Sequence, residues 1–182
     1  AGHIVTSVDI DSSAVGRHFA NNFEVIYPAF SKNFITSLLN VALKHKVECI
    51  VPLVTNELLL LSENLEIFQK NNIEVIISDS KNLKIANNKL RCYQTLNTIS
   101  SSIPKFQRVK TIDKLKDQVI KLGYPNSPVV IKPSCSNGSR GVRVFDSNND
   151  FYHEVFVQKP GSLICNIDQY ISSLKQMNKV PE

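Results

Sequence analysis

A short segment between residues 129 and 142 has the residue types and spacing of a phosphate-binding loop. Its apolar residues 129–131 end on Lys132, and a lysine at the end of a buried strand is costly unless its ammonium meets an anion. Successive backbone amides of the following loop can form a concave anion site. The loop carries small, hydroxyl and basic residues: Ser136, Gly138, Ser139, Arg140 and Gly141. The alternative is a plain hairpin loop in which Lys132 extends its ammonium to solvent.

The order of residues in this segment distinguishes it from the common P-loop. In the P-loop pattern G-x-x-x-x-G-K-[ST], the glycines precede the lysine and a helix follows. Here Lys132 precedes both glycines, and residues 142–145, three apolar side chains with Arg143 among them, predict a returning strand. We therefore expect the lysine and its loop to connect the two strands of an antiparallel hairpin.

The first 84 residues alternate between short apolar runs and longer runs with helical spacing. The apolar runs predict strands at 4–9, 23–28, 49–54 and 73–77. The runs between them predict helices at 12–21, 31–46 and 57–71. Strands that alternate with helices form parallel sheets with right-handed crossovers, so we expect a Rossmann-like α/β domain over residues 1–84.

The pattern changes near residue 84, and a second domain is expected over residues 85–182. Its predicted helices are 81–100, 111–122 and 167–177, and its predicted strands are 106–109, 129–132 and 142–145. An antiparallel hairpin beside helices is an α+β arrangement and does not continue the parallel sheet. Tyr93 and Phe106 are expected in the core of this domain.

The composition is that of a globular protein and argues against several functions. Of the 182 residues, 42% are hydrophobic and 20% charged, and no apolar run approaches the ~20 residues that cross a bilayer. The net charge of +5 comes from scattered basic residues, so no nucleic-acid partner is expected. The four cysteines form no C-x-x-C pair, which favours free, buried thiols over a zinc site. We expect a cytoplasmic protein with no membrane partner.

Two acidic residues of the first domain could face a ligand. Asp9 ends the first predicted strand, where a Rossmann domain holds a ribose hydroxyl with an acid, so an NAD-dependent protein is an alternative. The pattern G-x-G-x-x-G of such proteins does not occur in the sequence. Glu57 lies in the first turn of a predicted helix, where it either complements the helix dipole or faces a substrate. No catalytic residue and no metal ligand can be assigned.

The lysine-loop segment resembles the ATP-grasp superfamily, in which a strand, a Lys-Pro pair, a flexible glycine loop and a second strand form part of the small ATP-binding subdomain. A second stretch resembles the family pattern Asp-Lys, Leu and Gly-Ile-Pro that leads into the ATP-grasp domain. Its matching residues are Asn88, Lys89, Leu96, Ile103 and Pro104. Residues 8–28 and 50–58 look like successive units of the Rossmann-like domain that precedes it. The large subunit of carbamoyl phosphate synthase and its stand-alone relatives look most similar.

The resemblance implies a fold, a ligand and roles for the residues. The fold is a Rossmann-like pre-ATP-grasp domain with a parallel sheet, followed by the small α+β subdomain of an ATP-grasp fold, here truncated. Lys132 would contact the α-phosphate and adenine side of ATP, and Lys89 would reach the phosphates. The loop residues Ser136, Gly138, Ser139, Arg140 and Gly141 would cover the β- and γ-phosphates. The implied activity uses ATP and Mg²⁺ to turn a carboxylate into an acyl phosphate that an amine attacks.

The sequence also departs from the family pattern. Asn88 stands where the family has Asp, and Ser101-Ser102 replaces its glycine. The first Rossmann strand would precede Ala1, and the large subdomain, with the magnesium ligands, would follow Glu182. Residues 1–182 alone are therefore expected to be inactive. A non-catalytic nucleotide-binding module is a further alternative, and a homodimer is one expected assembly.

Overall fold

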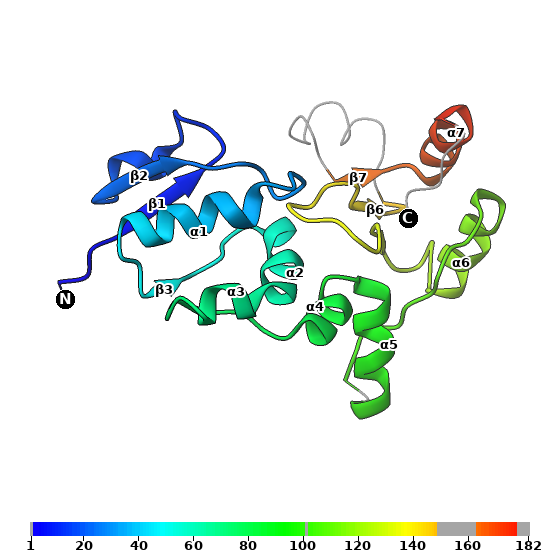
Figure 1. The fold of residues 1–182 in the computed structure, drawn as a ribbon. Helices are drawn as coiled ribbons and strands as arrows, with labels where there is room; N and C mark the ends of the chain where they lie inside the picture. Colours follow the sequence, from blue (N-terminus) through cyan, green and yellow to red (C-terminus); the bar gives the residue numbers. More distant parts are fainter. Residues whose placement is uncertain (1, 101, 149–162, 178–182) are drawn as a thin grey trace. The chain divides into compact units, whose positions relative to one another are not determined.

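The chain folds into two compact units, residues 1–84 and residues 85–182. The computed structural model describes residues 2–100, 102–148 and 163–177, and Figure 1 traces them from the N-terminus to the C-terminus. Each unit is built around its own cluster of buried hydrophobic residues. None of the described helices is long and apolar enough to span a membrane.

The first unit alternates short strands with helices, as the sequence predicts. Its elements are β1 (Thr6–Asp9), η1 (Val15–His18), β2 (Asn22–Val25), α1 (Phe34–Lys44), β3 (Cys49–Ile50), α2 (Thr55–Glu63), α3 (Leu65–Gln69) and β4 (Glu74–Val75). The next element, α4 (Ser80–Ala86), contains the boundary between the units. The predicted helix at 12–21 is reduced to the single turn η1. The predicted helix at 57–71 is interrupted at Asn64, whose side-chain amide donates to the Leu60 carbonyl 2.8 Å away.

The strands of the first unit pair in parallel, which confirms the predicted α/β class. β1 pairs with β2, and β3 pairs with β4, but the two pairs are separate two-stranded sheets. One core nevertheless serves both pairs. Helix α1 buries Phe34, Leu38 and Ala42, which are spaced four residues apart and so share one face of the helix. They pack with buried residues of the other elements: Ile26, Leu61, Phe68, Ile73 and Val75.

In its described residues, the second unit contains a three-stranded mixed sheet and four helical elements. These are α5 (Lys89–Ile99), η2 (Ile112–Lys114), α6 (Leu115–Lys121), β5 (Val129–Ile131), β6 (Arg143–Phe145), β7 (Ile164–Cys165) and α7 (Ile167–Met177). β5 and β6 are antiparallel, so the predicted hairpin is correct. β7 pairs in parallel with β6 and was not predicted, because two residues are too short for a periodic signal.

The core of the second unit lies between this sheet and helices α6 and α7. Its buried residues are Leu115, Val119, Val129, Phe145, Ile167 and Leu174. The Phe145 ring contacts Tyr170, with centroids 5.5 Å apart. The predicted strand at 106–109 is wrong, since this segment has no ladder partner among the described residues. None of the four cysteines is buried, which corrects a second expectation.

Candidate nucleotide site

The start of helix α5 is joined directly to the lysine loop. Asn88 caps the helix, because its side-chain oxygen accepts a hydrogen bond from the Arg91 backbone N–H at 3.0 Å. The Asn88 side-chain amide also donates to the Cys135 sulfur at 3.4 Å. The Lys89 backbone N–H donates to the Ser134 carbonyl oxygen at 2.8 Å. Two segments that lie more than 40 residues apart in sequence therefore meet at one point.

The Lys89 side chain strengthens this junction. Its ammonium donates to the backbone carbonyl oxygen of Ser136 at 2.6 Å and to the Ser136 hydroxyl at 3.2 Å. A lysine ammonium has three donors, so it can make these bonds and still donate to a further acceptor. Lys89 thus places a positive charge beside the loop while holding the loop in place.

The loop backbone adopts conformations that glycine favours. Gly138, Ser139 and Gly141 have φ values of 57°, 58° and 74°, in the left-handed region. At Gly141 a β-carbon would lie only 2.6 Å from Cγ of Pro133, so the close approach of the two segments requires glycine. The Arg140 guanidinium donates to the Asn137 side-chain oxygen at 2.6 Å. Arg140 therefore folds back onto its own loop in this conformation.

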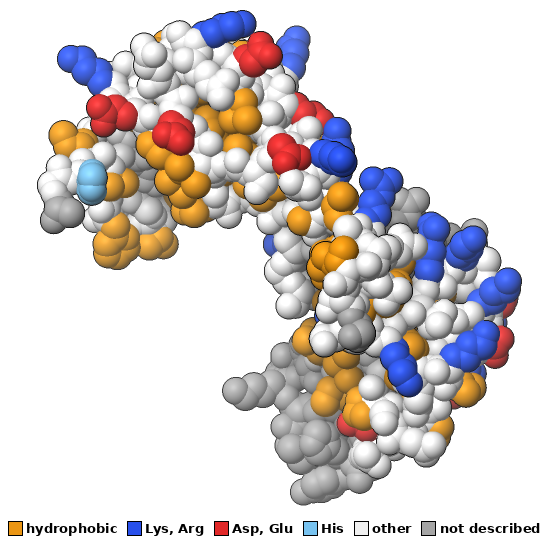
Figure 2. Space-filling model, turned by 90° about the horizontal axis from the view of Figure 1, so that it is seen from below, with side chains coloured by type: hydrophobic (Ala, Val, Ile, Leu, Met, Phe, Trp, Pro, Cys, Tyr) orange, Lys and Arg blue, Asp and Glu red, His pale blue; other side chains and the backbone are white. Residues whose placement is uncertain are grey.

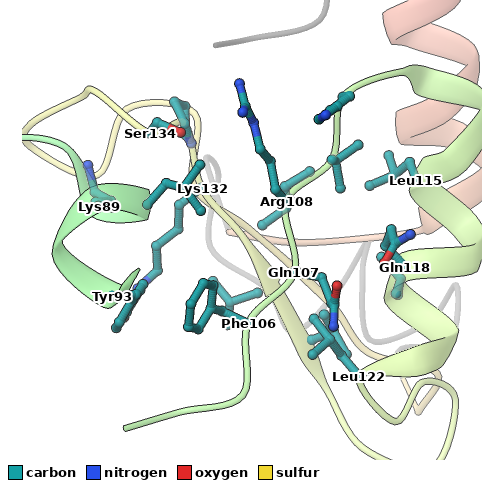
Figure 3. Close-up of a pocket in the computed structure, with 18 of the residues that line it drawn as sticks. Lys89, Tyr93, Phe106, Gln107, Arg108, Leu115, Gln118, Leu122, Lys132 and Ser134 are labelled. Carbon is teal, nitrogen blue, oxygen red and sulfur yellow. The ribbon is translucent and has the colours of Figure 1, made fainter. Parts of the chain in front are cut away.

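A cavity of about 1230 Å³ opens beside this junction, within the second unit. In Figure 3, Lys89 and Tyr93 project from α5, Lys132 and Ser134 come from the end of β5, and Arg108 comes from the segment that carries Phe106 and Gln107. No acidic residue is among the described residues that line the cavity. Six basic residues line it: Lys89, Arg91, Lys105, Arg108, Lys110 and Lys132. In the described part of the chain, none of these six forms an ion pair.

An apolar surface lies next to the basic residues. Val130 and Lys132 are two positions apart on an extended segment, so their side chains point to the same side. Val130 is 47% exposed although it lies in a strand, and it lines the cavity. Half-buried Tyr93 and Phe106 stack with ring centroids 5.4 Å apart and also line the cavity. An aromatic or heterocyclic ring could therefore pack here beside a cationic rim.

The cavity also exposes polar groups of its inner wall. The side-chain oxygen of Gln118, on α6, is buried and has no hydrogen-bond partner among the described residues. Tyr170 lines the same wall, and burial raises the pKa of its phenol above the usual value. The Gln118 amide does not ionise and the Tyr170 phenol stays protonated at pH 7, so the charge of the described cavity lining comes from its basic residues.

The charge of the whole chain is divided unevenly between the units. Residues 85–182 contain 14 Lys and Arg against seven Asp and Glu, a formal net charge of +7. Residues 1–84 contain seven Lys and Arg against nine Asp and Glu, a formal net charge of −2. Figure 2 shows basic side chains, in blue, on the surface of both units. The positive potential that would attract a polyphosphate is thus located around the candidate site.

The two acidic candidates belong to the first unit. Asp9 ends β1, and Glu57 lies in the first turn of α2, directly after β3. Burial of the Glu57 side chain, and next the nearby charge of Asp9, raise the pKa of the Glu57 carboxyl above its usual value. The two carboxyl groups are therefore neighbours near the carboxyl ends of parallel strands, where α/β domains commonly bind ligands.

The structure brings together some of the candidates from the second unit. Lys89 and Lys132 line the same cavity, and Lys89 contacts Ser136 directly. Ser136 and the loop residues 138–141 are not among the residues that line the cavity. Sequence reasoning missed Arg108, Val130 and the Tyr93–Phe106 pair as cavity residues. The i, i+2 relation of Val130 to Lys132 was a usable signal, because alternate residues of a strand share a face. Arg108 carries no local signal, and Tyr93 and Phe106 were expected in the core.

The chain was compared with protein families, curated proteins and solved structures, and these comparisons support its fold. Residues 1–76 match the family PylC-like, N-terminal domain. This match concerns the N-terminal part of the chain. No curated protein matches the sequence.

Several solved carboxylase structures share the fold. Biotin carboxylase of Campylobacter jejuni, determined with β-γ-ATP, is 20% identical with a TM-score of 0.51, covering 76% of this chain and 31% of that chain. The biotin carboxylase domain dimer of Hydrogenobacter thermophilus 2-oxoglutarate carboxylase, determined with MgADP, ADP and bicarbonate, gives the same values. Pyruvate carboxylase of Rhizobium etli is 19% identical with a TM-score of 0.50, covering 76% of this chain and 13% of that one.

These similarities confirm the predicted fold, that of the N-terminal region of an ATP-grasp enzyme. The chain spans less than a third of the length of each of these structures. Among the described residues, no group of three or more His, Cys, Asp or Glu is placed to hold a metal ion. The cavity itself has no described carboxylate, so its residues fit a polyanion but do not fit Mg²⁺ on their own.

Proposed function

We propose that the chain is part of an ATP-dependent carboxylate–amine ligase of the ATP-grasp kind, and that the cavity of its second unit binds ATP. The observation that carries this proposal is a cavity lined by six basic residues that form no ion pair with any described residue. Ser134 and Cys135, the first residues of the loop after the Lys132-Pro133 pair, also line it. Lys89 is half-buried and the other five are exposed, and a polyphosphate would give this cluster of like charges the anionic partner that the described residues do not supply.

Each part of the site has a role in this proposal. Lys132 and Lys89 bind phosphate oxygens, and the amides and hydroxyls of Ser136, Gly138, Ser139, Arg140 and Gly141 cover the terminal phosphates. Val130 supports the adenine ring on the face that it shares with Lys132. Arg140 would exchange its bond to Asn137 for a phosphate contact, since a charge-assisted bond to phosphate is stronger than one to a neutral amide.

The chemistry follows from positioning and charge neutralisation. Bound ATP supplies a γ-phosphoryl group, and transfer of that group to a carboxylate gives an acyl phosphate that an amine then attacks. Asp9 and Glu57 are proposed to face a substrate, and the magnesium ligands to lie beyond Glu182. By its sequence pattern the protein would be a carbamoyl phosphate synthase-like, cytoplasmic and homodimeric enzyme. Residues 1–182 alone would then show no turnover.

The test is calorimetric titration of Mg-ATP into the full-length protein, comparing wild type with Lys132→Met. Loss of a charge-assisted contact is expected to weaken binding by about 1.5 to 3 kcal/mol, roughly ten- to a hundredfold. Lys121→Met is the matched control, because Lys121 is an exposed residue at the end of α6 that does not line the cavity, and this variant should bind as wild type does. Equal ATP affinity in wild type and Lys132→Met would show that the site is misplaced.

A second measurement addresses the reaction. Hydroxylamine converts acyl phosphates to hydroxamates, so ATP-dependent hydroxamate formation from small carboxylates should occur with the full-length protein and not with residues 1–182. ATP binding without any hydroxamate would favour a non-catalytic nucleotide-binding module. Binding of NADH in place of ATP would favour an NAD-dependent Rossmann protein.

A further inference from the structure

The cavity of the second unit contains more basic residues than one ATP molecule can neutralise. Lys89 and Lys132 bind phosphates in the proposed site, whereas Arg108 and Lys110 lie on a different segment and have no role there. Mg-ATP carries only about two net negative charges, because the metal ion offsets part of the charge on the phosphates. Six cations in one cavity would therefore still attract a further anion when Mg-ATP is bound.

Arg108 and Lys110 point to the same side of an extended segment. Residues 104–110 contain no turn or bend, and side chains alternate between the two sides of such a segment. Val109 packs against the second core, so its neighbours Arg108 and Lys110 point away from that core. Both side chains are exposed, and in the described part of the chain neither forms a hydrogen bond or an ion pair. We call these two residues the Arg108–Lys110 pair.

Strand β5 alternates in the same way. Val129 and Ile131 pack in the second core, whereas Val130 and Lys132 point to the other side. Lys132 and Arg108 both line the cavity. The two segments therefore present their cations on the side of the cavity that faces away from the core.

The acidic residue nearest in sequence to the Arg108–Lys110 pair faces a different lysine. Asp113 follows Lys110 by three positions, but its carboxylate lies 3.9 Å from the Lys175 ammonium. No acidic residue is among the described residues that line the cavity. The described part of the chain thus provides cations at this point and leaves the anion to a ligand.

Arg108 points to the loop end of the cavity. In Figure 3 its side chain extends toward the end that holds Ser134, whereas Phe106 turns toward Tyr93. Ser134 belongs to the loop that would cover the terminal phosphates of ATP. A group that accepts the γ-phosphoryl must lie beside those phosphates, within reach of the phosphorus atom. The aromatic end of the cavity is the less suitable place for such a group.

We propose that the Arg108–Lys110 pair binds the carboxylate that accepts the phosphoryl group, at the same time as ATP is bound. This inference rests on the proposed function. A guanidinium holds a carboxylate through two parallel hydrogen bonds, and a lysine adds a point charge. In the transfer, a carboxylate oxygen forms a bond to the γ-phosphorus, the bond from that phosphorus to the bridging oxygen breaks, and ADP leaves with the electron pair of that bond.

The experiment is calorimetric titration of succinate, a simple carboxylate probe, into the full-length protein saturated with non-hydrolysable Mg-AMP-PNP. Wild type should bind succinate saturably, with a dissociation constant of about 1 to 10 mM. Arg108→Met should weaken succinate binding at least roughly tenfold and Mg-AMP-PNP binding by less than about threefold, and Lys132→Met should do the reverse. Arg108→Lys keeps the charge but loses the two parallel bonds, so its loss should be intermediate. Lys121→Met is the control and should bind both ligands as wild type does.

The outcomes separate this inference from the proposed ATP site. If succinate does not bind saturably, or if it competes with Mg-AMP-PNP, the inference is wrong and the ATP site stands. If Arg108→Met weakens nucleotide binding as much as Lys132→Met does, Arg108 is a phosphate ligand and the inference is again wrong. Inorganic phosphate is the second probe, because Arg108-dependent binding of phosphate without binding of succinate would assign the pair to the released product. Equal nucleotide affinity in wild type and Lys132→Met would contradict the proposed function itself.

Discussion

The ammonium of Lys89 lies 2.6 Å from the backbone carbonyl oxygen of Ser136, 47 residues further along the chain. This contact joins the first turn of α5 to the loop after β5, and the Lys89 backbone N–H adds a second bond to the same loop at Ser134. Helix and loop therefore behave as one piece, so a change in either is expected to affect the other.

Replacing Lys89 by Met should loosen the loop. The substitution keeps the length of the side chain but removes both bonds to Ser136, each worth about 0.5 to 3 kcal/mol according to charge. Amides of residues 138–141 should exchange faster in the variant, as followed by hydrogen exchange and mass spectrometry. Lys121→Met removes an equal charge elsewhere and should leave loop exchange unchanged. Identical hydrogen exchange of residues 138–141 in wild type and Lys89→Met would contradict the role of Lys89 in holding the loop.

Asn88→Ala should destabilise α5 by about 1 kcal/mol, because the helix loses its N-cap acceptor for the Arg91 N–H. Asn88→Asp keeps an acceptor oxygen and should retain most of this stability, although it loses the donor to Cys135. The opening free energy of α5, measured by native-state hydrogen exchange, distinguishes the two variants. If Asn88→Ala and Asn88→Asp lose equal stability in α5, the contact to Cys135 matters more than the cap.

Gly141→Ala should destabilise the hairpin by roughly 1 to 3 kcal/mol, since alanine is disfavoured at the φ of 74° and its β-carbon would clash with Pro133. Gly2→Ala is the control, because no atom lies within 4 Å of the added carbon and its φ is not in the left-handed region. Urea denaturation followed by circular dichroism gives the difference. A neutral Gly141→Ala would mean that Pro133 can move away at no cost.

Phe68→Ala should cost about 3 to 5 kcal/mol, because Phe68 is fully buried in the first core and its removal leaves a cavity. Phe30→Ala makes the same chemical change in the same unit at a side chain that is 92% exposed, and it should change stability by less than about 0.5 kcal/mol. Denaturation midpoints of the two variants test the assignment of this core.

The stability of the first unit should depend on the protonation of Glu57. Burial and the charge of Asp9 raise the pKa of Glu57 above its ordinary value of 4.5, so folding favours the neutral form. The resulting contribution to stability is fully present below that ordinary value and is lost as pH rises through the raised pKa. Glu57→Gln should therefore be more stable than wild type at pH 7, and the difference should disappear below about pH 4.5. The free energy of unfolding of wild type and Glu57→Gln, measured over the same range of pH, tests this. Glu66→Gln makes the same change at an exposed position and is the control.

Local sequence patterns located the long helix α1 correctly, but they overestimated the helix at 12–21 and the lengths of the strands. Helix α1 lies within the predicted range because Phe34, Leu38 and Ala42 repeat with the helical period. Strand β3 has only two paired residues, whereas the apolar run around it predicted six. The reason is that an apolar run indicates burial, while a strand also needs a partner edge, and a partner is a tertiary property.

The sequence alone determined the chemistry that is present: a lysine at the end of an apolar strand, a loop with glycines at positions that need a left-handed backbone, and alternating α/β elements before it. These features are local, because they depend on residue type and on spacing of a few positions. Only the tertiary structure decided that Lys89 bonds to Ser136 and that Arg108 and Val130 share a cavity with Lys132. Those relationships join residues from separate segments of the chain, and they arise from how the second unit folds these segments around one core.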